Sequence, residues 1–291
     1  MYAQFFGSYL LNQHAVSPEA LTNAIQHMYE THIKLGTLAI HMGYITAEQV
    51  DDVCETQKKA DMRFGEIALD KEYLTLPQAK ELLNAQRPEY LLLGQELIDE
   101  GVLTNSQFET LLADYQFDAD ISDLGTEENE ESENIIRKFF ADAERPVDDY
   151  TLLYLNMVFN DFVRFIGSDF TPLPAVKMTT YTSTHCISQN VTGEISLVSR
   201  LDMDDRAAIG FASRFAKMEF EKYDDYVIAS IGDFLNLHNG LYSVNMSNQY
   251  AVELELDPPM EEDKKSISVD DRTYVIPVIY PFGTVHLILT I

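Results

Sequence analysis

Hydrophobic and polar positions in the first third of the chain recur with a period of 29 residues. When the sequence is written in steps of this length, successive segments begin at Phe5, Lys34, Arg63 and Leu92. Each segment has glycine at its third position, and no gap is needed to align the four. A fixed period of this size is typical of stacked supersecondary units, so we predict a repeat architecture here.

Each of these segments has the pattern of two helices. A short apolar stretch follows the glycine, as in LAIHMG, and a polar break then leads to a residue that can cap a second helix. The capping residues are Ser17, Thr46, Thr75 and Thr104. Apolar residues at three- and four-residue spacing follow, as in AEQVDDVCETQ. We therefore predict an all-α helical repeat domain of four units over residues 1–116.

The last half of the chain mixes helical and strand patterns in a segregated order. A helix that is apolar on nearly all sides is predicted from Asp149. Two strands joined at Thr192–Gly193 follow, then helices starting near Asp204 and Asp224, and finally three strands in QYAVELELDPP, TYVIPVIYPFG and TVHLILTI. Such an order predicts an α+β domain over 149–291, with helices packed on a largely antiparallel sheet.

The distribution of acidic residues along the chain marks a boundary between these two domains. The chain carries a net charge of −28, which disfavours nucleic acid and anionic lipid as partners. Acidic residues are densest between the domains, where EENEESE stands at 127–133. We predict a solvated acidic linker over residues 117–148, and hence a two-domain α+β protein.

Several function classes lack their sequence signals. No apolar run reaches the roughly 20 residues of a membrane helix, and the N-terminus has no leader pattern, so we expect a cytoplasmic protein without membrane insertion. The two cysteines, Cys54 and Cys186, are expected to be reduced thiols. The sequence has no metal-ligand cluster, no Gly-rich phosphate loop and no Cys–His constellation, so no metal site is predicted.

The repeats fit the pattern R-L-G-x-x-L-x-x-x-G-x6-L-x3-L-x2-Q, given twice with five residues between. They resemble the N-terminal domain of type II secretion and type IV pilus assembly ATPases, in the version that binds cyclic di-GMP. The resemblance implies ligand-binding positions at Lys34, Gly36, Gln57, Arg63, Gly65 and Gln86. Lys34 replaces an Arg of that family, and Glu72 replaces a Gly. The alternative is a protein-docking or dimerising scaffold without a nucleotide.

The stretch IGDFLNLHNG at 231–240 places Asp233 and Asn236 on one face of a predicted helix. Spacing alone carries no weight, because 13 Asn and 48 acidic residues give three acid-x-x-Asn pairs, about as many as chance produces. Of the flanking residues, His238 is interpreted as a surface or capping residue. The pair gains significance only from the elements that surround it.

Those elements are the buried opening helix, the paired late strands ending after Tyr280-Pro281-Phe282-Gly283, and the helix with IGDFLNLHNG. Together they resemble the CheX branch of the CheC, CheX and FliY chemotaxis phosphatases. The resemblance implies a fold like theirs and removal of the aspartyl phosphate of a CheY-like response regulator. By that resemblance Asn236 would hold the attacking water, and Asp233, a Glu in the family, would pair with a lysine of the regulator.

The regulator would supply Mg²⁺, so no cofactor of the chain's own is expected. A homodimer is also implied, because CheX-like domains can dimerise through their sheets. Three functions therefore remain open. They are a phosphatase acting on a response regulator, a non-enzymatic adaptor that binds a regulator or pilus and secretion partners, and a cyclic di-GMP receptor.

Overall fold

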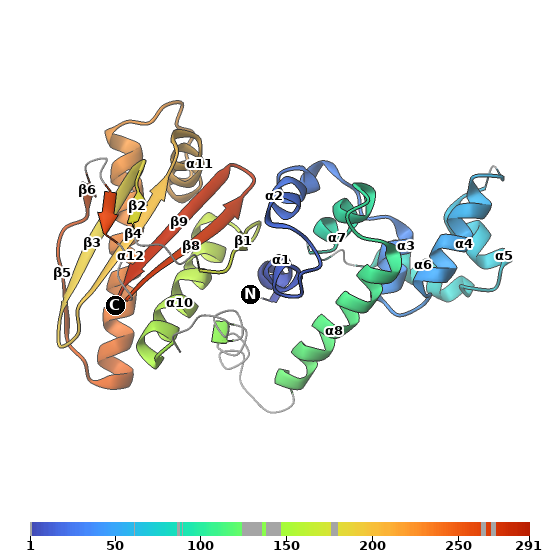
Figure 1. Ribbon diagram of the computed structural model, residues 1–291, viewed down its shortest axis with the longest axis horizontal. Helices are drawn as coiled ribbons and strands as arrows, with labels where there is room; N and C mark the ends of the chain where they lie inside the picture. Colours follow the sequence, from blue (N-terminus) through green and yellow to red (C-terminus); the bar gives the residue numbers. More distant parts are fainter. Residues whose placement is uncertain are drawn as a thin grey trace. The chain divides into compact units, whose positions relative to one another are not determined.

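The computed structural model describes residues 2–60, 62–85, 88, 90–123, 136–137, 147–175, 180–262, 266–268 and 272–291. The chain separates into two compact units, Met1–Ser8 with Thr126–Ile291, and Tyr9–Gly125 (Figure 1). The first eight residues, which the sequence analysis placed with the repeats, thus belong to the same unit as the C-terminal half. Phe5 accounts for this, because its ring packs edge-to-face on Phe159 with centroids 5.3 Å apart.

The unit Tyr9–Gly125 is helical throughout its described regular structure. Its helices are α1 (Tyr2–Asn12, which begins in the other unit), α2 (Pro18–His27), η1 (Met28–Glu30), α3 (Leu35–His41), α4 (Ala47–Gln57), α5 (Phe64–Asp70), α6 (Leu76–Asn84), α7 (Tyr90–Asp99) and α8 (Asn105–Asp123). Apart from η1, they fall two to each predicted 29-residue segment. The equivalence of the four units in three dimensions stays a prediction.

The predicted capping residues stand at the starts of the second helices. Thr46 Oγ1 accepts from the backbone N–H of Gln49 at 3.3 Å, and Gln49 Oε1 accepts from the N–H of Thr46 at 2.9 Å. This reciprocal capping box satisfies two backbone donors that the helix leaves unpaired. The same arrangement recurs in Thr75 with Gln78 and in Thr104 with Gln107. These helix-start predictions are confirmed, including that at Ser17, whose hydroxyl accepts from Ala20 N.

Four residues spaced 29 apart take a left-handed backbone conformation at the ends of the first helices. His14, Gly43, Glu72 and Gly101 have φ of 54°, 66°, 59° and 73°. Glycine adopts this region without a steric penalty, whereas a residue with a Cβ is strained there. Glu72 therefore keeps the backbone turn that Gly43 makes, although it is the wrong residue type for it.

We expect Glu72→Gly to stabilise the helical unit by about 0.5–1 kcal/mol, because relief of left-handed strain exceeds the entropy that glycine adds to the unfolded chain. Gly43→Ala is the matched opposite change. It should destabilise by about 1 kcal/mol through the backbone alone, since an added Cβ meets nothing within 4 Å. Urea unfolding followed by circular dichroism measures both, and shifts of the same sign would contradict the explanation.

Helix α8 extends into the predicted linker. It continues to Asp123, so the first seven residues of the predicted linker, 117–123, are helical. The acidic composition suggested a solvated segment, but this stretch has no Gly or Pro to end the helix before Gly125. Most of the remaining predicted linker, 124–135 and 138–146, lies outside the described residues.

The other unit combines helices with an antiparallel sheet. Its helices are α10 (Asp149–Asp161), the π-helical turn η2 (Phe162–Ile166), α11 (Asp205–Ala216) and α12 (Asp225–Tyr250). Its strands are β1 (Thr171–Pro172), β2 (Thr180–Thr182), β3 (His185–Gly193), β4 (Leu197–Met203), β5 (Leu254–Leu256), β6 (Met260–Glu262), β7 (Ser266–Ser268), β8 (Thr273–Tyr280) and β9 (Gly283–Thr290). The α+β prediction with an antiparallel sheet is confirmed.

The main sheet has the strand order β1-β8-β9-β4-β3-β5, with β6 also paired to β3. All its described pairs are antiparallel. The predicted helices begin where expected, capped by Asp148, Asp204 and Asp224. The small strands β1, β2, β6 and β7 were not predicted, because their two or three residues are not part of a longer alternating run, as β5 is in QYAVELELDPP.

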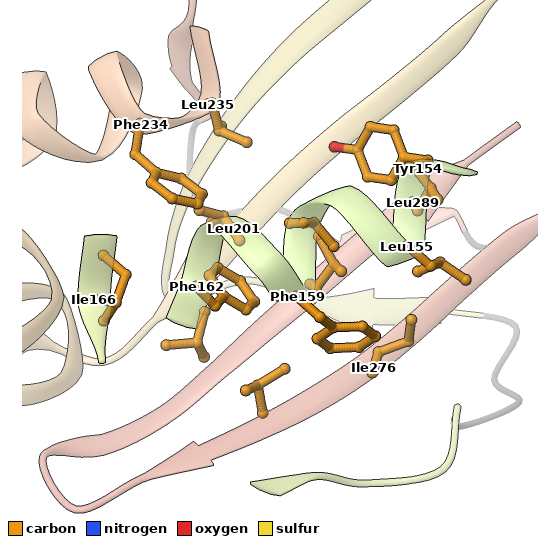
Figure 2. Packing of buried hydrophobic residues seen from close by; sticks show 14 of the residues in the cluster. Tyr154, Leu155, Phe159, Phe162, Ile166, Leu201, Phe234, Leu235, Ile276 and Leu289 are labelled. Atoms are coloured by element: carbon orange, nitrogen blue, oxygen red, sulfur yellow. The ribbon is translucent and has the colours of Figure 1, made fainter. Parts of the chain in front are cut away.

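The core of this unit lies between the helices and one face of the sheet. Figure 2 shows Phe159 of α10 near Ile276 of β8, and Phe162 and Leu289 belong to the same buried cluster. Each of these four side chains has no exposed surface. The helix that was predicted to be apolar on nearly all sides is therefore buried on nearly all sides, as its pattern requires.

Two consecutive prolines divide the strand that borders β3. β5 pairs with the end of β3 and β6 with its beginning, and Asp257, Pro258 and Pro259 lie between them. Proline has no backbone N–H to donate to a strand ladder, so pairing is interrupted at this point. Asp257 is instead held by Asn190, whose carbonyl accepts from Asp257 N at 3.0 Å.

Candidate functional site

The predicted pair lies on helix α12. Asp224 caps this helix, accepting from Tyr226 N at 3.1 Å. Asp233 and Asn236 are both exposed, whereas the intervening Phe234 and Leu235 are buried against the core. Because residues three apart share a helix face, both polar side chains project outward from the same side. The structure thus places the predicted site residues together and accessible.

The two side chains differ in how firmly they are held. Asp233 makes no hydrogen bond or ion pair to any residue in the described part of the chain. Asn236 Oδ1 accepts from Gln189 Nε2 of strand β3 at 2.9 Å. An exposed carboxylate therefore stands beside an exposed carboxamide that is tied to the sheet.

Gln189 is itself buried and fully occupied. It is 1% exposed. Its Nε2 donates to Asn236 Oδ1 and to the backbone carbonyl of Asp257 at 2.8 Å, and its Oε1 accepts from Asn239 Nδ2 at 2.8 Å. The break in pairing at the two prolines leaves this carbonyl free to accept from a side chain.

The network continues into the core. Asn239 Nδ2 also donates to Ser199 Oγ at 2.8 Å, and Asn239 Oδ1 accepts from the hydroxyl of Tyr154 at 3.2 Å. Burial raises the pKa of Tyr154, so this hydroxyl keeps its proton and acts as the donor. Two carboxamides in series thus connect a buried tyrosine to the exposed Asn236.

Helix α12 approaches the proline segment closely just before Asp233. A Cβ placed on Gly232 would lie 3.3 Å from Pro259 Cβ. A larger residue would therefore push the helix away from Pro259. Glycine at this position lets the turn that carries Asp233 pack directly on the segment that also orients Gln189.

Exposed apolar side chains lie along the same helix face. Tyr226 and Val244 are 75% and 57% exposed. They stand seven residues before and eleven after Asp233, which a helix of 3.6 residues per turn brings to one side. Met260, which follows Pro259, is 60% exposed. The polar pair is therefore set among apolar groups that a protein partner can cover.

The interpretation of His238 as a surface or capping residue is wrong. Its side chain has no exposed surface, and Nδ1 lies 2.7 Å from Asp161 Oδ2, on helix α10. Its ring packs against Tyr154 and Phe234. At two residues beyond Asn236 the helix turns by about 200°, which carries the side chain from the outer face into the core.

His185 and Cys186, neighbours on strand β3, have structural roles. His185 stacks on Tyr223 with centroids 3.7 Å apart, and its Nε2 lies 2.6 Å from Asp205. Its neighbour Cys186 is buried, and burial raises the pKa of the thiol, which leaves it unreactive. Within the described ranges, no three His, Cys, Asp or Glu side chains form a group able to hold a metal ion.

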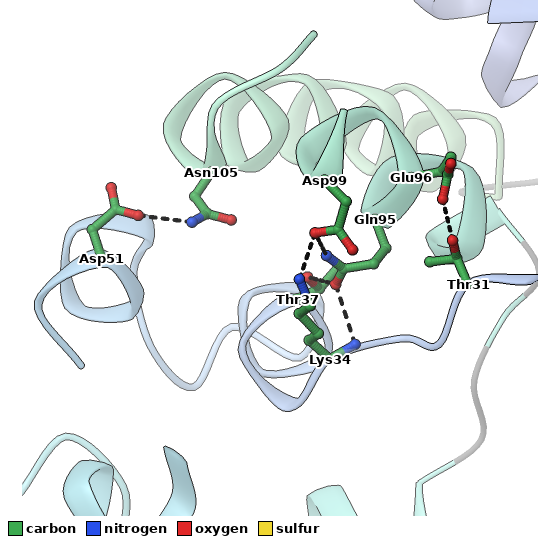
Figure 3. A network of polar contacts seen from close by, with 8 residues as sticks. All are labelled: Thr31, Lys34, Thr37, Asp51, Gln95, Glu96, Asp99 and Asn105. Carbon is green, nitrogen blue, oxygen red and sulfur yellow. Dashed lines mark hydrogen bonds and ion pairs between the residues drawn. The ribbon is translucent and has the colours of Figure 1, made fainter. Parts of the chain in front are cut away.

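Lys34, the first candidate for cyclic di-GMP binding, already has protein partners (Figure 3). Its Nζ lies 2.5 Å from Asp99 of helix α7, and its backbone N–H donates to the buried Gln95 at 3.2 Å. Gln95 also accepts from Thr37 Oγ1 at 2.6 Å and donates to Asp99. An anionic ligand at Lys34 would have to displace the Asp99 carboxylate.

The remaining cyclic di-GMP candidates that the structure describes lie on α3, α4 and α5 or at their ends. Gln57 is exposed and donates to the carbonyl of Met62 at 3.2 Å, and Arg63 is exposed at the start of α5. Gly36 and Gly65 lie in the first turns of α3 and α5. Gly36 is required for packing, since an added Cβ would stand 2.9 Å from Val50. The last candidate, Gln86, lies outside the described residues.

The residues behind Asn236 were not predicted from the sequence. Gln189 lies between Ile187 and Val191 on the strand face that points to the core, where a period of two predicts an apolar residue. Asn239 lies three residues after Asn236, on a turn of the helix that is buried. A polar residue in a core-facing position was the available signal in both cases.

No family model matches the sequence, and no curated protein matches it. Solved structures with a similar arrangement include a chemotaxis protein CheX from Desulfovibrio desulfuricans (13% identity, 49% of this chain and 98% of that chain, TM-score 0.40). Another is the chemotaxis protein CheX from Vibrio vulnificus (11% identity, 49% of this chain and 99% of that chain, TM-score 0.42). A third is the complex of CheX with CheY, BeF₃ and Mg from Borrelia burgdorferi (17% identity, 48% of this chain and 96% of that chain, TM-score 0.38).

No helix within the described residues is both long enough and apolar enough to cross a bilayer.

Proposed function

We propose that the chain docks a CheY-like response regulator on helix α12 and removes the phosphoryl group from its aspartate. The observation that carries this proposal is the exposure of Asp233 and Asn236 on one face of α12, with Asn236 tied to Gln189. The order of helices and strands that resembles the CheX branch adds support. No group of the chain itself has to form a covalent bond with phosphate.

The proposed chemistry needs a neutral, positioned amide. Hydrolysis of an aspartyl phosphate requires a water in line with the leaving oxygen, and the regulator supplies the phosphoryl group and Mg²⁺. A carboxamide both donates and accepts hydrogen bonds and carries no charge to repel the phosphate. Asn236 keeps two Nδ2 hydrogens and one Oδ1 lone pair after its bond to Gln189, enough to hold a water beside the phosphoryl group.

Asp233 would serve docking. Its carboxylate, which has no partner among the described residues, suits an ion pair with a lysine of the regulator. Asp is one methylene shorter than the Glu of the resembling family, so it reaches about 1.5 Å less, by one carbon–carbon bond length. Close approach of the partner to α12 compensates for this, and the apolar Tyr226 and Met260 provide surface for such contact.

Two alternative functions remain, an adaptor and a cyclic di-GMP receptor. An adaptor without activity would use the same helix face, and it differs from the proposal only in rate. Cyclic di-GMP binding at the repeats has no observation in its favour, because Lys34 is paired with Asp99 and Gly36 is used in packing. That site, the likeness of the repeats to secretion and pilus ATPases, and the homodimer stay predictions.

Asn236→Ala tests the proposed function. We expect wild-type protein to accelerate phosphate release from a phosphorylated CheY-like receiver domain, and the variant to lose about 100-fold of this rate, because the water is no longer positioned. Phosphate release is measured over a panel of receiver domains, each with and without the protein.

Asn248→Ala is the matched control, since Asn248 is an exposed asparagine near the end of the same helix. It should match wild type. Equal rates for wild type and Asn236→Ala would exclude catalysis by this pair. Acceleration of none of the receiver domains, combined with binding of one of them in its BeF₃-activated form, would favour the adaptor.

A further inference from the structure

We propose that Gln189 is a positioning residue for Asn236, and that it turns the carboxamide so that Nδ2 faces outward to the partner. The catalytic consequence of this inference rests on the proposed function. The orientation of the Asn236 carboxamide does not depend on it. Gln189 belongs to strand β3 and is buried, so it meets neither water nor the regulator. It acts only through its bond to Asn236.

The orientation of Gln189 is decided by a backbone carbonyl. The carbonyl oxygen of Asp257 can only accept a hydrogen bond, and it lies 2.8 Å from one terminal atom of the Gln189 side chain. That atom must therefore be the nitrogen. The same nitrogen lies 2.9 Å from Asn236, so the Asn236 atom that faces it must be the acceptor Oδ1.

The opposite end of Gln189 leads to the same conclusion. Its Oε1 faces Asn239, which must present Nδ2, and Asn239 Oδ1 then faces the hydroxyl of Tyr154. Turning Gln189 over would set its oxygen against the Asp257 carbonyl and its nitrogen against Asn239 Nδ2. Both contacts would be lost inside the core, where unpaired polar groups are costly.

This network restricts the side chain of Asn236 to one conformation. An exposed asparagine ordinarily changes rotamer freely, but here one lone pair of Oδ1 is held by Gln189, a buried side chain that also bonds Asp257 and Asn239. The outward surface then consists of two N–H donors and the second lone pair of Oδ1. A donor directed at a phosphoryl oxygen and an acceptor directed at a water match what the proposed reaction requires.

Side-chain amide relaxation in wild-type protein tests the orientation without any variant. We expect the Nδ2 hydrogens of Asn236 to show an order parameter near 0.85, as a rigid backbone does, whereas those of exposed Asn248 should fall below about 0.6. An Asn236 as mobile as Asn248 would overturn the proposal, whether or not the protein is a phosphatase.

Gln189→Met tests the consequence for catalysis, because it keeps the volume and removes the hydrogen bonds. We expect the Asn236 amide to become mobile and kcat for phosphate release to fall about 10- to 100-fold. KM and the affinity for the BeF₃-activated receiver should change less than about 3-fold, since the docking groups remain. Asn190→Ala, which touches the same Asp257 but not Asn236, should leave all these values unchanged.

The double variant separates positioning from a general structural effect. In the Asn236→Ala background, Gln189→Met should cause no further loss of rate, because the group it positions is already gone. A further loss equal to that in wild type would overturn the proposal. If wild type has no phosphatase activity, the proposed function fails, while the relaxation measurement still decides whether Gln189 orders Asn236.

Discussion

Phe162→Ala is expected to destabilise the C-terminal unit by about 4 kcal/mol, through lost burial and the cavity that remains. Phe162 has no exposed surface and begins the π-helical turn after α10. Its ring lies within 6.3 Å of five other aromatic rings, those of Phe159, Phe170, Phe211, Phe234 and Tyr280. These rings come from separate elements, so they cannot all close on the space that is left.

Phe165→Ala is the matched change three residues later. Phe165 is half-buried and packs on the rim against Phe215, so its loss should cost about 1–2 kcal/mol. Urea midpoints from circular dichroism, with the slope of the transition unchanged, measure both variants. Equal destabilisation by the two variants would show that Phe162 is not the centre of the aromatic core.

Asp161→Ala is expected to cost about 3–5 kcal/mol, because it leaves one member of a buried pair without its partner. Asp161 Oδ2 accepts from His238 Nδ1 at 2.7 Å, and both side chains are buried. The other ring nitrogen, Nε2, already has no hydrogen-bond partner among the described residues. Removing the carboxylate would leave the whole imidazole unsatisfied between α10 and α12.

Asp161→Asn distinguishes loss of the hydrogen bond from loss of volume. Its amide oxygen can still accept from His238 Nδ1, so we expect less than half the destabilisation of the alanine variant. Asn160→Ala, at the exposed neighbouring position, should change the free energy of unfolding by less than about 0.5 kcal/mol. Asparagine and alanine variants of equal stability would contradict a hydrogen-bonded pair.

The helices and longer strands could be predicted because their signals are local. Capping residues such as Thr46 and Asp204 act within one helical turn, and β8 and β9 contain enough residues to show their apolar pattern. Helix α8 runs into the predicted acidic linker, because acidic composition is only a weak guide to where a helix ends. Strands of two or three residues exist through pairing with distant segments, as β6 does with β3.

The candidate site was predictable only in part. The sequence predicted that Asp233 and Asn236 share one helix face, and both side chains are exposed on one face of α12. It placed His238 on the surface as well, although the same helical geometry turns that residue into the core. The contact between Asn236 and Gln189 could not be predicted from the residues near Asn236 in the sequence, because Gln189 is 47 residues away.

The sequence by itself determined which segments form helices and long strands, and which residues share a helix face, because these follow from periods and caps a few residues long. Only the tertiary structure decided that Gln189 meets Asn236, that the Asp257 carbonyl orients it, and that Asp161 meets His238. Each of these contacts joins residues on different elements, and their hydrogen-bond directions depend on donors and acceptors that folding brings together.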